Sequence, residues 1–201
     1  MHTASTLELA LLSLLQQQPR SGYALRRAFA TTPLTHFSDS PGAIYPALQR
    51  LRRRGWIRLA PRIRQTNGRG KRTMAPTPRG IAAWRTWLRR PVERPDIIGG
   101  MDEVMLRFAF LEEGVSRRAA ARLLVSLQKQ IAAYLPTLEA YAAEAAASMS
   151  LSGRLALQSG IEGYRARARW ARRAEQRLTR PQQKAAGAKR ARRSGRTRWS
   201  R

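Results

Sequence analysis

The sequence predicts a mainly α-helical protein with one two-stranded hairpin in its N-terminal half. Three observations support this prediction. Apolar residues recur at three- and four-residue steps through most of the 201-residue chain, which is the period of a helix that buries one face. Ser or Thr, in places followed by Pro, stands where several of these stripes begin. One segment alternates between apolar and polar residues instead, and the pair Asn67-Gly68 that follows it favours a hairpin turn.

Two helices are expected at the start of the chain. Ser5 and Glu8, three residues apart, form a capping box that opens a helix over roughly residues 6–17. The apolar stripe of this helix is Leu7, Leu11, Leu14 and Leu15. Ser21 can cap a second helix, whose apolar contacts are Tyr23, Leu25 and Phe29.

The third helix divides into an apolar face and a polar face. Ser40 is its expected N-cap, Pro41 takes the first helical position, and Gly55 ends it. Pro46 lies inside this span and should loosen or kink the first turns. One side carries Ile44, Leu48 and Leu51, which we expect to pack on the first two helices. The N-cap and the remaining faces carry small, amide, aromatic and cationic residues, namely Ser40, Gly42, Tyr45, Gln49, Arg52 and Arg53.

The hairpin and a fourth helix complete the N-terminal half. Residues 56–59 form the first expected strand and residues 71–75 the return strand, and Thr77-Pro78 then opens a helix. Basic residues surround the Gly-rich turn, namely Arg62, Arg64, Arg69, Lys71 and Arg72. Three helices, a two-stranded wing and a following helix make a winged helix-turn-helix over residues 1–90. The polar face of the third helix then predicts contacts with base edges and phosphates, and the wing predicts contacts with the minor groove or flanking phosphates.

The C-terminal half is expected to be a separate helical region. Prolines and the pair Gly99-Gly100 predict a linker over 91–100, and helices are expected over residues 101–112, from Ser116 onward with a kink at Pro136, and over residues 151–178. The two longer helices carry apolar stripes: Leu123, Leu127, Ile131 and Tyr134 on one, and Leu155, Ile161, Tyr164 and Trp170 on the other. Two helices on a flexible linker cannot bury both apolar stripes against each other, and a second copy of the chain would cover the remainder. Residues 101–180 are therefore predicted to form a dimerisation or effector region. The alternative is that the stripes pack back on the winged helix within one chain.

The positive charge is large and unevenly placed. The chain has 39 Lys and Arg against 12 Asp and Glu, a formal net charge of +27. Residues 1–90 hold 17 basic and 2 acidic side chains, residues 91–180 hold 14 and 10, and residues 181–201 hold 8 and 0. Solubility of a small domain needs a net charge of only about 2–8, so a polyanion is the expected partner. The segment 181–201 is expected to be a basic disordered tail.

The composition argues against an enzyme. Cysteine is absent, the two histidines are His2 and His36, and no phosphate-binding loop, metal cluster or nucleophile triad is recognisable. We therefore expect no cofactor and no metal. No apolar run approaches the roughly 18 residues of a membrane span. No membrane partner is expected, and the predicted location is the cytoplasm, at the nucleoid.

Three stretches of the N-terminal half resemble the PadR family of bacterial transcriptional regulators: LALLSLLQQQPRSGYALRR, GAIYPALQRLRRRGWI and TPRGIAAWRTWL. The segment QSGIEGYRARARW is similar to the helical dimerisation region of that family. The resemblance covers about residues 1–180, and the arginine-rich tail is atypical. It implies a homodimer that binds an inverted repeat in double-stranded DNA and, as in many members, a repressor released by a small-molecule effector.

Two other functions account for part of the sequence. An RNA-binding protein would explain the charge and the tail, although not the long apolar C-terminal helices, which favour a partner helix. A nucleoid-type structural protein would bind DNA without sequence preference. A sequence-specific transcriptional regulator is the function that the combined patterns favour.

Overall fold

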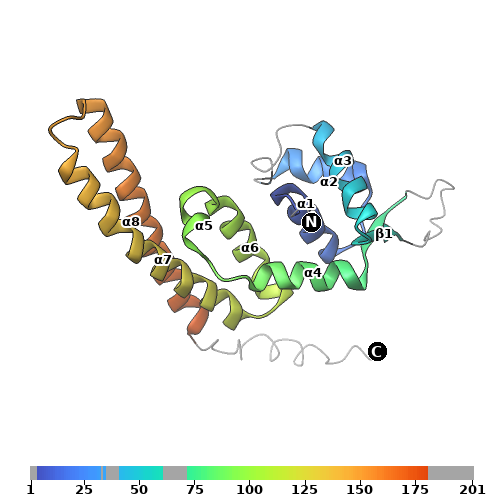
Figure 1. The fold of residues 1–201 in the computed structure, drawn as a ribbon. Helices are drawn as coiled ribbons and strands as arrows, with labels where there is room; N and C mark the ends of the chain where they lie inside the picture. Colours follow the sequence, from blue (N-terminus) through green and yellow to red (C-terminus); the bar gives the residue numbers. More distant parts are fainter. Residues whose placement is uncertain (1–3, 33, 35–40, 61–71, 181–201) are drawn as a thin grey trace, which may run out of the picture.

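The computed structural model describes residues 4–32, 34, 41–60 and 72–180. Figure 1 shows a winged helix at one end and a long helical hairpin at the other, joined by α4, α5 and α6. The elements are α1 (Thr6–Gln17), α2 (Gly22–Thr31), α3 (Pro41–Arg53), β1 (Ile57–Leu59), β2 (Met74–Pro76), α4 (Pro78–Arg89), α5 (Arg94–Gly99), α6 (Met101–Gly114), α7 (Arg117–Glu144) and α8 (Leu151–Thr179). The predicted fold class is confirmed.

The caps expected from the sequence set the starts of α1 and α2. Ser5 Oγ accepts from the backbone N–H of Glu8 at 3.3 Å, and the Glu8 side chain accepts from the N–H of Ser5 in return. Ser21 Oγ accepts from the N–H of Ala24 at 3.2 Å. Ser40, the expected cap of α3, lies outside the described residues. Helix α3 continues across Pro46.

The described part of the wing is a short two-stranded ladder that includes Pro76. Strands β1 and β2 are antiparallel and three residues long, with Ile57 opposite Pro76 and Leu59 opposite Met74. The return strand was expected at 71–75, but β2 extends to Pro76, which has no N–H to donate. The pairing resumes beyond this gap, because the N–H of Thr77 donates to Trp56 O at 2.9 Å. Met74 also exchanges backbone hydrogen bonds with Arg20, so the loop between α1 and α2 covers the other edge of β2.

The segment predicted to be a linker contains a helix, which corrects that expectation. Helix α5 occupies residues 94–99 and packs on α6 and α7. Pro95 falls in the first turn, where the missing N–H does not interrupt the helix. The Asp96 carboxylate accepts from the N–H of Glu93 at 2.8 Å and pairs with Arg90 Nη2 at 2.5 Å. Pro95, which suggested a linker, therefore lies in the first turn of a helix whose N-terminus is capped by the carboxylate of Asp96.

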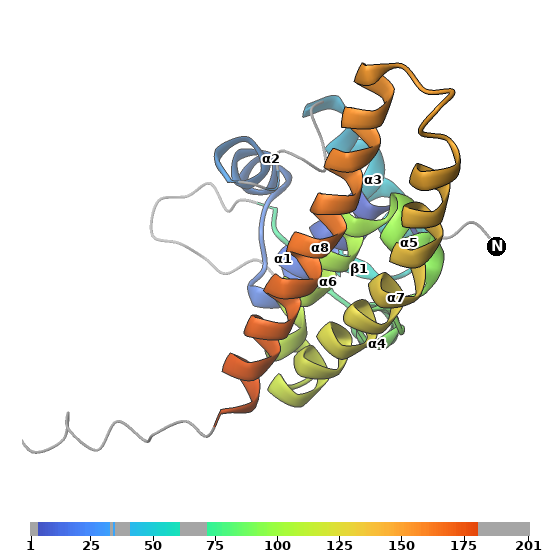
Figure 2. The ribbon, with the colours of Figure 1, turned by 90° about the vertical axis from the view of Figure 1, so that its left-hand side faces the viewer.

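Helices α7 and α8 form an antiparallel hairpin that projects from the rest of the chain (Figures 1 and 2). Helix α7 has 28 residues and continues across Pro136, and α8 has 29. The base of the hairpin packs on α5 and α6. No helix among the described residues is long and apolar enough to span a bilayer.

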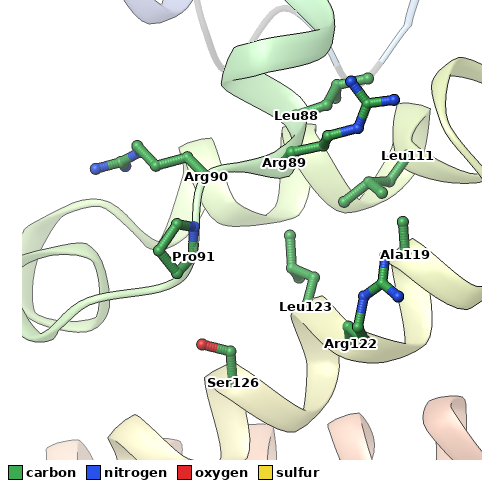
Figure 3. Close-up of a pocket in the computed structure, with 9 residues that line it drawn as sticks. All are labelled: Leu88, Arg89, Arg90, Pro91, Leu111, Ala119, Arg122, Leu123 and Ser126. Carbon is green, nitrogen blue, oxygen red and sulfur yellow. The ribbon is translucent and has the colours of Figure 1, made fainter.

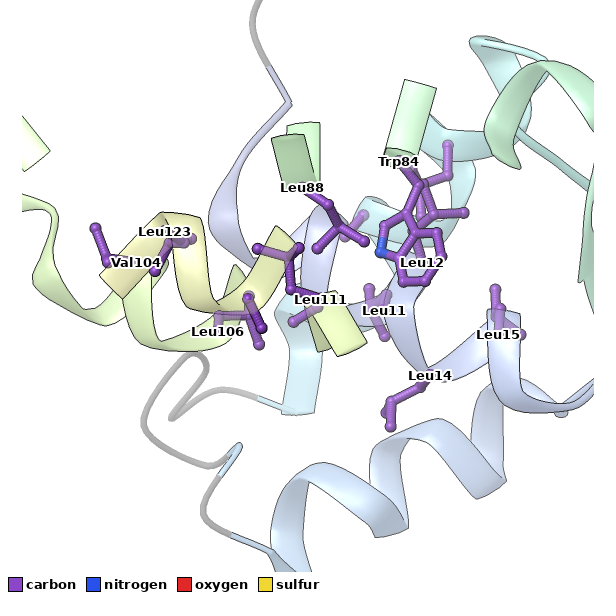
Figure 4. Close-up of a cluster of buried hydrophobic side chains, with 14 of the residues drawn as sticks. Leu11, Leu12, Leu14, Leu15, Trp84, Leu88, Val104, Leu106, Leu111 and Leu123 are labelled. Atoms are coloured by element: carbon purple, nitrogen blue, oxygen red, sulfur yellow. The ribbon is translucent and has the colours of Figure 1, made fainter. Parts of the chain in front are cut away.

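One hydrophobic core connects the winged helix with the C-terminal helices. Figure 4 shows Trp84 and Leu88 of α4 gathered with Leu11 and Leu12 of α1 and with Leu111 of α6. Trp84 Nε1 donates to Ser13 Oγ at 2.9 Å, and both side chains are buried. A side chain on Gly114 would collide with the Trp84 ring, so this glycine permits the close approach of α4 and α6.

Three residues of α7 assigned to a dimer interface lie in this core instead. Leu123, Leu127 and Ile131 are buried within the single chain, as is Ile161 of α8. The prediction assumed that α7 and α8 had only each other to pack against. Helices α5 and α6 pack on α7 and supply the missing cover, so Leu123, Leu127 and Ile131 are corrected from interface to core, and Ile161 is buried within the chain as well.

Candidate nucleic-acid interface

Helix α3 presents the polar face that the sequence predicted. Ile44, Leu48 and Leu51 are buried against the rest of the winged helix. Gly42, Tyr45, Gln49, Arg52 and Arg53 are exposed. The last three line one shallow hollow on the surface. The predicted division of α3 into a buried and an exposed face is confirmed, and the exposed face carries an amide and two guanidinium groups that can donate to bases or phosphates.

Tyr45 is held against α2 by a glycine. Its side chain is 48% exposed. A Cβ placed on Gly22 would lie 2.8 Å from Tyr45 Cε1, so the ring occupies the space that any larger residue would take. The glycine therefore lets the ring of Tyr45 pack over the start of α2 while the rest of the side chain faces solvent.

Glu8 has a second role that the sequence did not reveal. It is 1% exposed, and its carboxylate accepts from Arg50 Nε of α3 and lies 3.6 Å from Arg54 Nη2. Arg54 also stacks over the ring of Trp56, with its Cζ 5.3 Å from the ring centroid. These two arginines therefore tie α3 to α1 and to the wing, while Arg52 and Arg53 on the other side face solvent. The four-residue spacing of Arg50 and Arg54 was the available signal for this division.

The described part of the wing is basic. Arg72 is exposed beside β2, as predicted, and Arg58 of β1 is exposed as well. Arg58 was not among the predicted contacts, although the alternation of the strand could have indicated that it faces outward. Arg62, Arg64, Arg69 and Lys71 lie outside the described residues.

A pocket of about 360 Å³ lies between α4, α6 and α7 (Figure 3). Leu88, Leu111 and Leu123 give it an apolar lining, and Arg89 and Arg122 add two cationic groups. The side chain of Arg90 also belongs to the lining but points away from the other residues (Figure 3). Arg90 is paired with Asp96 at 2.5 Å and with Glu103 at 3.4 Å. The pocket thus combines an apolar lining with positive charge at the junction of the winged helix and the C-terminal helices.

Arg107 of α6 is the most unusual side chain of this junction. It is fully buried, and none of its three guanidinium nitrogens has a hydrogen-bond partner among the described residues. Burial lowers the pKa of Arg107, and nearby Arg90 lowers it further, whereas Asp96 and Glu103 act in the opposite direction. The two carboxylates therefore stabilise a charge that they do not contact through hydrogen bonds.

The aromatic residues predicted for dimerisation make contacts within the chain. Tyr164 OH donates to Ile97 O at 3.0 Å, and burial raises the pKa of Tyr164, with a further contribution from Tyr134. The rings of Tyr134 and Tyr164 are 5.4 Å apart edge to face, and those of Trp170 and Phe108 are 5.5 Å apart.

Large apolar residues remain exposed on α5 and on the first half of α7, where Ile98 is 55% and Val125 49% exposed, as well as toward the far end of the hairpin. Leu155, which was predicted, is 55% exposed, and it is accompanied by Tyr141 at 53% and Leu151 at 64%. Apart from Leu155, the exposed apolar residues therefore differ from the predicted stripe, and they are not confined to the far end of the hairpin. Among the described residues no group of His, Asp or Glu is placed to hold a metal ion.

Comparison with known proteins gives a match in the N-terminal half. Residues 11–85 match the model of the transcriptional regulator PadR-like family. Among solved structures, PadR from Bacillus subtilis in complex with operator DNA is 25% identical, with 88% of this chain and 99% of that chain covered and a TM-score of 0.41. The B. subtilis protein in complex with p-coumaric acid is 25% identical, with 87% and 99% covered and a TM-score of 0.39.

A PadR-like regulator from Bacillus cereus is 23% identical, with 85% of this chain and 94% of that chain covered and a TM-score of 0.38. No curated protein matches the chain. Because these TM-scores are below 0.5, we base the function on the N-terminal match and on the residues of this chain.

Proposed function

This chain belongs to the PadR-like family of transcriptional regulators, which are DNA-binding proteins rather than enzymes, and on that premise we propose that it represses transcription as a homodimer bound to an inverted repeat. The DNA-reading part is residues 1–90, and the helical part, residues 101–180, pairs the two chains. Such a regulator acts at the nucleoid, in the cytoplasm.

The proposal rests above all on the exposed face of α3. Gln49, Arg52 and Arg53 share one surface hollow, on the side of the helix opposite Ile44, Leu48 and Leu51. Gln can pair with both hydrogen-bonding groups of adenine, and Arg with those of guanine. Gly42 near the start of the helix leaves room for the DNA backbone to approach, and the basic wing supplies phosphate or minor-groove contacts.

The partner proposed for the hairpin is a second copy of this chain. Tyr141, Leu151 and Leu155 expose apolar side chains toward the distal end of α7 and α8, where the single chain offers them no cover. A two-fold contact there would bury all three on both chains. Two-fold symmetry would also set the two α3 helices about one turn of DNA apart, about 34 Å, as an inverted repeat requires.

The pocket between α4, α6 and α7 is the proposed site of a small-molecule effector. Its apolar lining and the guanidinium groups of Arg89 and Arg122 suit a small molecule with an anionic group and an apolar body. A ligand there would contact α4 of the winged helix and α7 of the hairpin together, so it could alter how the two parts are held. Thermal shift measurements with a panel of carboxylates, p-coumaric acid among them, test this, with Arg122→Ala as the pocket variant.

Selection of genomic fragments bound by the purified protein tests the proposed function. The proposal expects the enriched fragments to share an inverted repeat, and expects a duplex carrying it to bind far more tightly than structured RNA at the same salt concentration. Fragments without a shared sequence would indicate a nucleoid-type protein. Equal or tighter binding of RNA would indicate an RNA-binding protein. Either result would overturn the proposal.

A further inference from the structure

The second half of α8 carries a stripe of exposed arginines. Between residues 165 and 180 there are seven arginines and a single glutamate. At about 100° per residue, six of these arginines fall on one side of the helix. We call them the arginine stripe: Arg165, Arg169, Arg172, Arg173, Arg177 and Arg180, all of them exposed.

The stripe lies opposite the face that packs on the rest of the protein. The packed residues of this part of α8 are Tyr164, Ala168, Trp170, Ala171, Ala174 and Leu178. The one glutamate, Glu175, is turned toward α7, where it accepts from Gln128 Nε2 at 3.0 Å. The charged groups on the solvent-facing side of this part of α8 are therefore all cationic.

The positive charge of the stripe is largely uncompensated. Arg165 pairs with Glu139 at 2.7 Å, and the other five have no salt bridge to a described residue. Helix α7 adds further positive charge at the base of the hairpin, since Arg117 Nη2 donates to Arg177 O at 2.8 Å and Arg118 is exposed beside it. Like charges so close together repel one another unless an anion lies over them.

We propose that the arginine stripe is a second DNA-binding surface, which holds the phosphate backbone of double-stranded DNA without reading its sequence. This rests on the proposed function only in that the partner is DNA. From Arg165 to Arg180 the stripe is about 22 Å long, at about 1.5 Å per residue. Phosphates follow one another at about 3.4 Å along each DNA strand, so the stripe can face those of about six base pairs.

Other partners fit the stripe less well. A membrane-surface helix needs an apolar face free to enter the lipid, and in α8 that face is packed on the rest of the protein. A second copy of this chain would bring the same positive stripe to the contact. The chain also continues from Arg180 into a segment with eight basic and no acidic residues, which extends the same charge.

Two variants with equal loss of charge test the proposal. Arg169→Gln with Arg173→Gln removes two charges from the stripe. Arg154→Gln with Arg167→Gln removes two exposed charges of α8 outside it. Affinity for a labelled duplex of mixed sequence is measured over a range of salt concentrations. The salt slope is the decrease in the logarithm of the binding constant per unit increase in the logarithm of the salt concentration. If each phosphate that is no longer neutralised lowers this slope by about 0.9, the slope should fall by about 1.8 per chain in the stripe variant and stay unchanged in the control.

Binding of the stripe variant to the selected inverted repeat distinguishes a failure of this proposal from a failure of the proposed function. The stripe variant should keep the base preference of the wild type, because the stripe reads no sequence. Equal salt slopes for the stripe variant and the control would overturn the second surface and leave the operator-binding function intact. Loss of binding to phosphatidylserine vesicles, with duplex binding unchanged, would also overturn it, since the stripe would then be a membrane contact.

Discussion

The carboxylate of Glu8 in α1 accepts a hydrogen bond from Arg50 Nε in α3, although Glu8 is almost completely buried. This pair joins the first helix of the winged helix to the helix that we propose reads DNA. Its geometry holds the last turns of α3 so that Arg52 and Arg53 face solvent.

Arg50→Ala should destabilise the protein, because it removes a partner from a buried carboxylate. The free energy of unfolding should fall by about 1–3 kcal/mol, toward the lower end because Arg54 stays near Glu8. The matched control is Arg52→Ala, which removes an exposed arginine two positions away and should change the free energy by less than about 0.5 kcal/mol. Chemical denaturation measures both, and equal effects would show that the Glu8–Arg50 pair does not hold α3.

Arg107→Met should stabilise the protein. The buried guanidinium has no hydrogen-bond partner among the described residues and lies near the charge of Arg90. A buried ion without hydrogen-bond partners keeps a desolvation cost of several kcal/mol, and an apolar side chain of similar volume removes this cost. Arg107→Lys keeps the charge and serves as the control. Chemical denaturation compares the two variants, and a loss of stability in the Met variant would mean that Asp96 and Glu103 depend on the charge of Arg107.

The wing should contribute affinity without base preference. Arg58→Ala with Arg72→Ala removes two exposed charges at the base of the wing. Affinity should fall for all duplex sequences, and the salt slope should fall by about 0.9 for each phosphate that these arginines neutralise in the wild type. A slope equal to that of the wild type would show that both side chains face solvent in the complex. Arg69 and Lys71, nearer the turn, are the next pair to replace.

Leu151→Glu with Leu155→Glu should convert the dimer to a monomer. Both side chains are exposed, so the fold of one chain does not depend on them. Leu127→Glu with Ile131→Glu is a poor test of the interface, since both substitutions place a charge in the core and the chain should unfold. Sedimentation at micromolar concentration and circular dichroism separate these outcomes. A wild-type monomer, or a folded Leu151/Leu155 variant that remains dimeric, would contradict the proposed interface.

Local patterns predicted the N-terminal half well because its signals are local. The Ser5–Glu8 capping box and the stripe Ile44, Leu48 and Leu51 each act within one helix, and both are confirmed. The contact between Glu8 and Arg50 joins residues 42 positions apart. No local periodicity indicates such a pair, so only the capping role of Glu8 could be predicted.

The C-terminal half was predicted less well because its packing depends on distant elements. Pro95 and Gly99 read as a linker, yet Asp96 caps a helix there. That helix and α6 cover Leu127 and Ile131, which the sequence assigned to a partner. The buried Arg107 could not be foreseen either, since an arginine in an amphipathic helix is usually exposed.

The role of α3 in reading DNA depends on Gln49, and the decisive measurement is the affinity of Gln49→Ala for the selected inverted repeat and for versions changed at each base pair. If Gln49 pairs with a base, the variant should lose about 1–3 kcal/mol of binding free energy and lose its preference at one position of each half-site. The control Gln158→Ala, on the exposed side of α8, should bind as the wild type does. Unchanged affinity and unchanged base preference in the Gln49 variant would contradict the assignment of α3 as the helix that reads DNA through this residue.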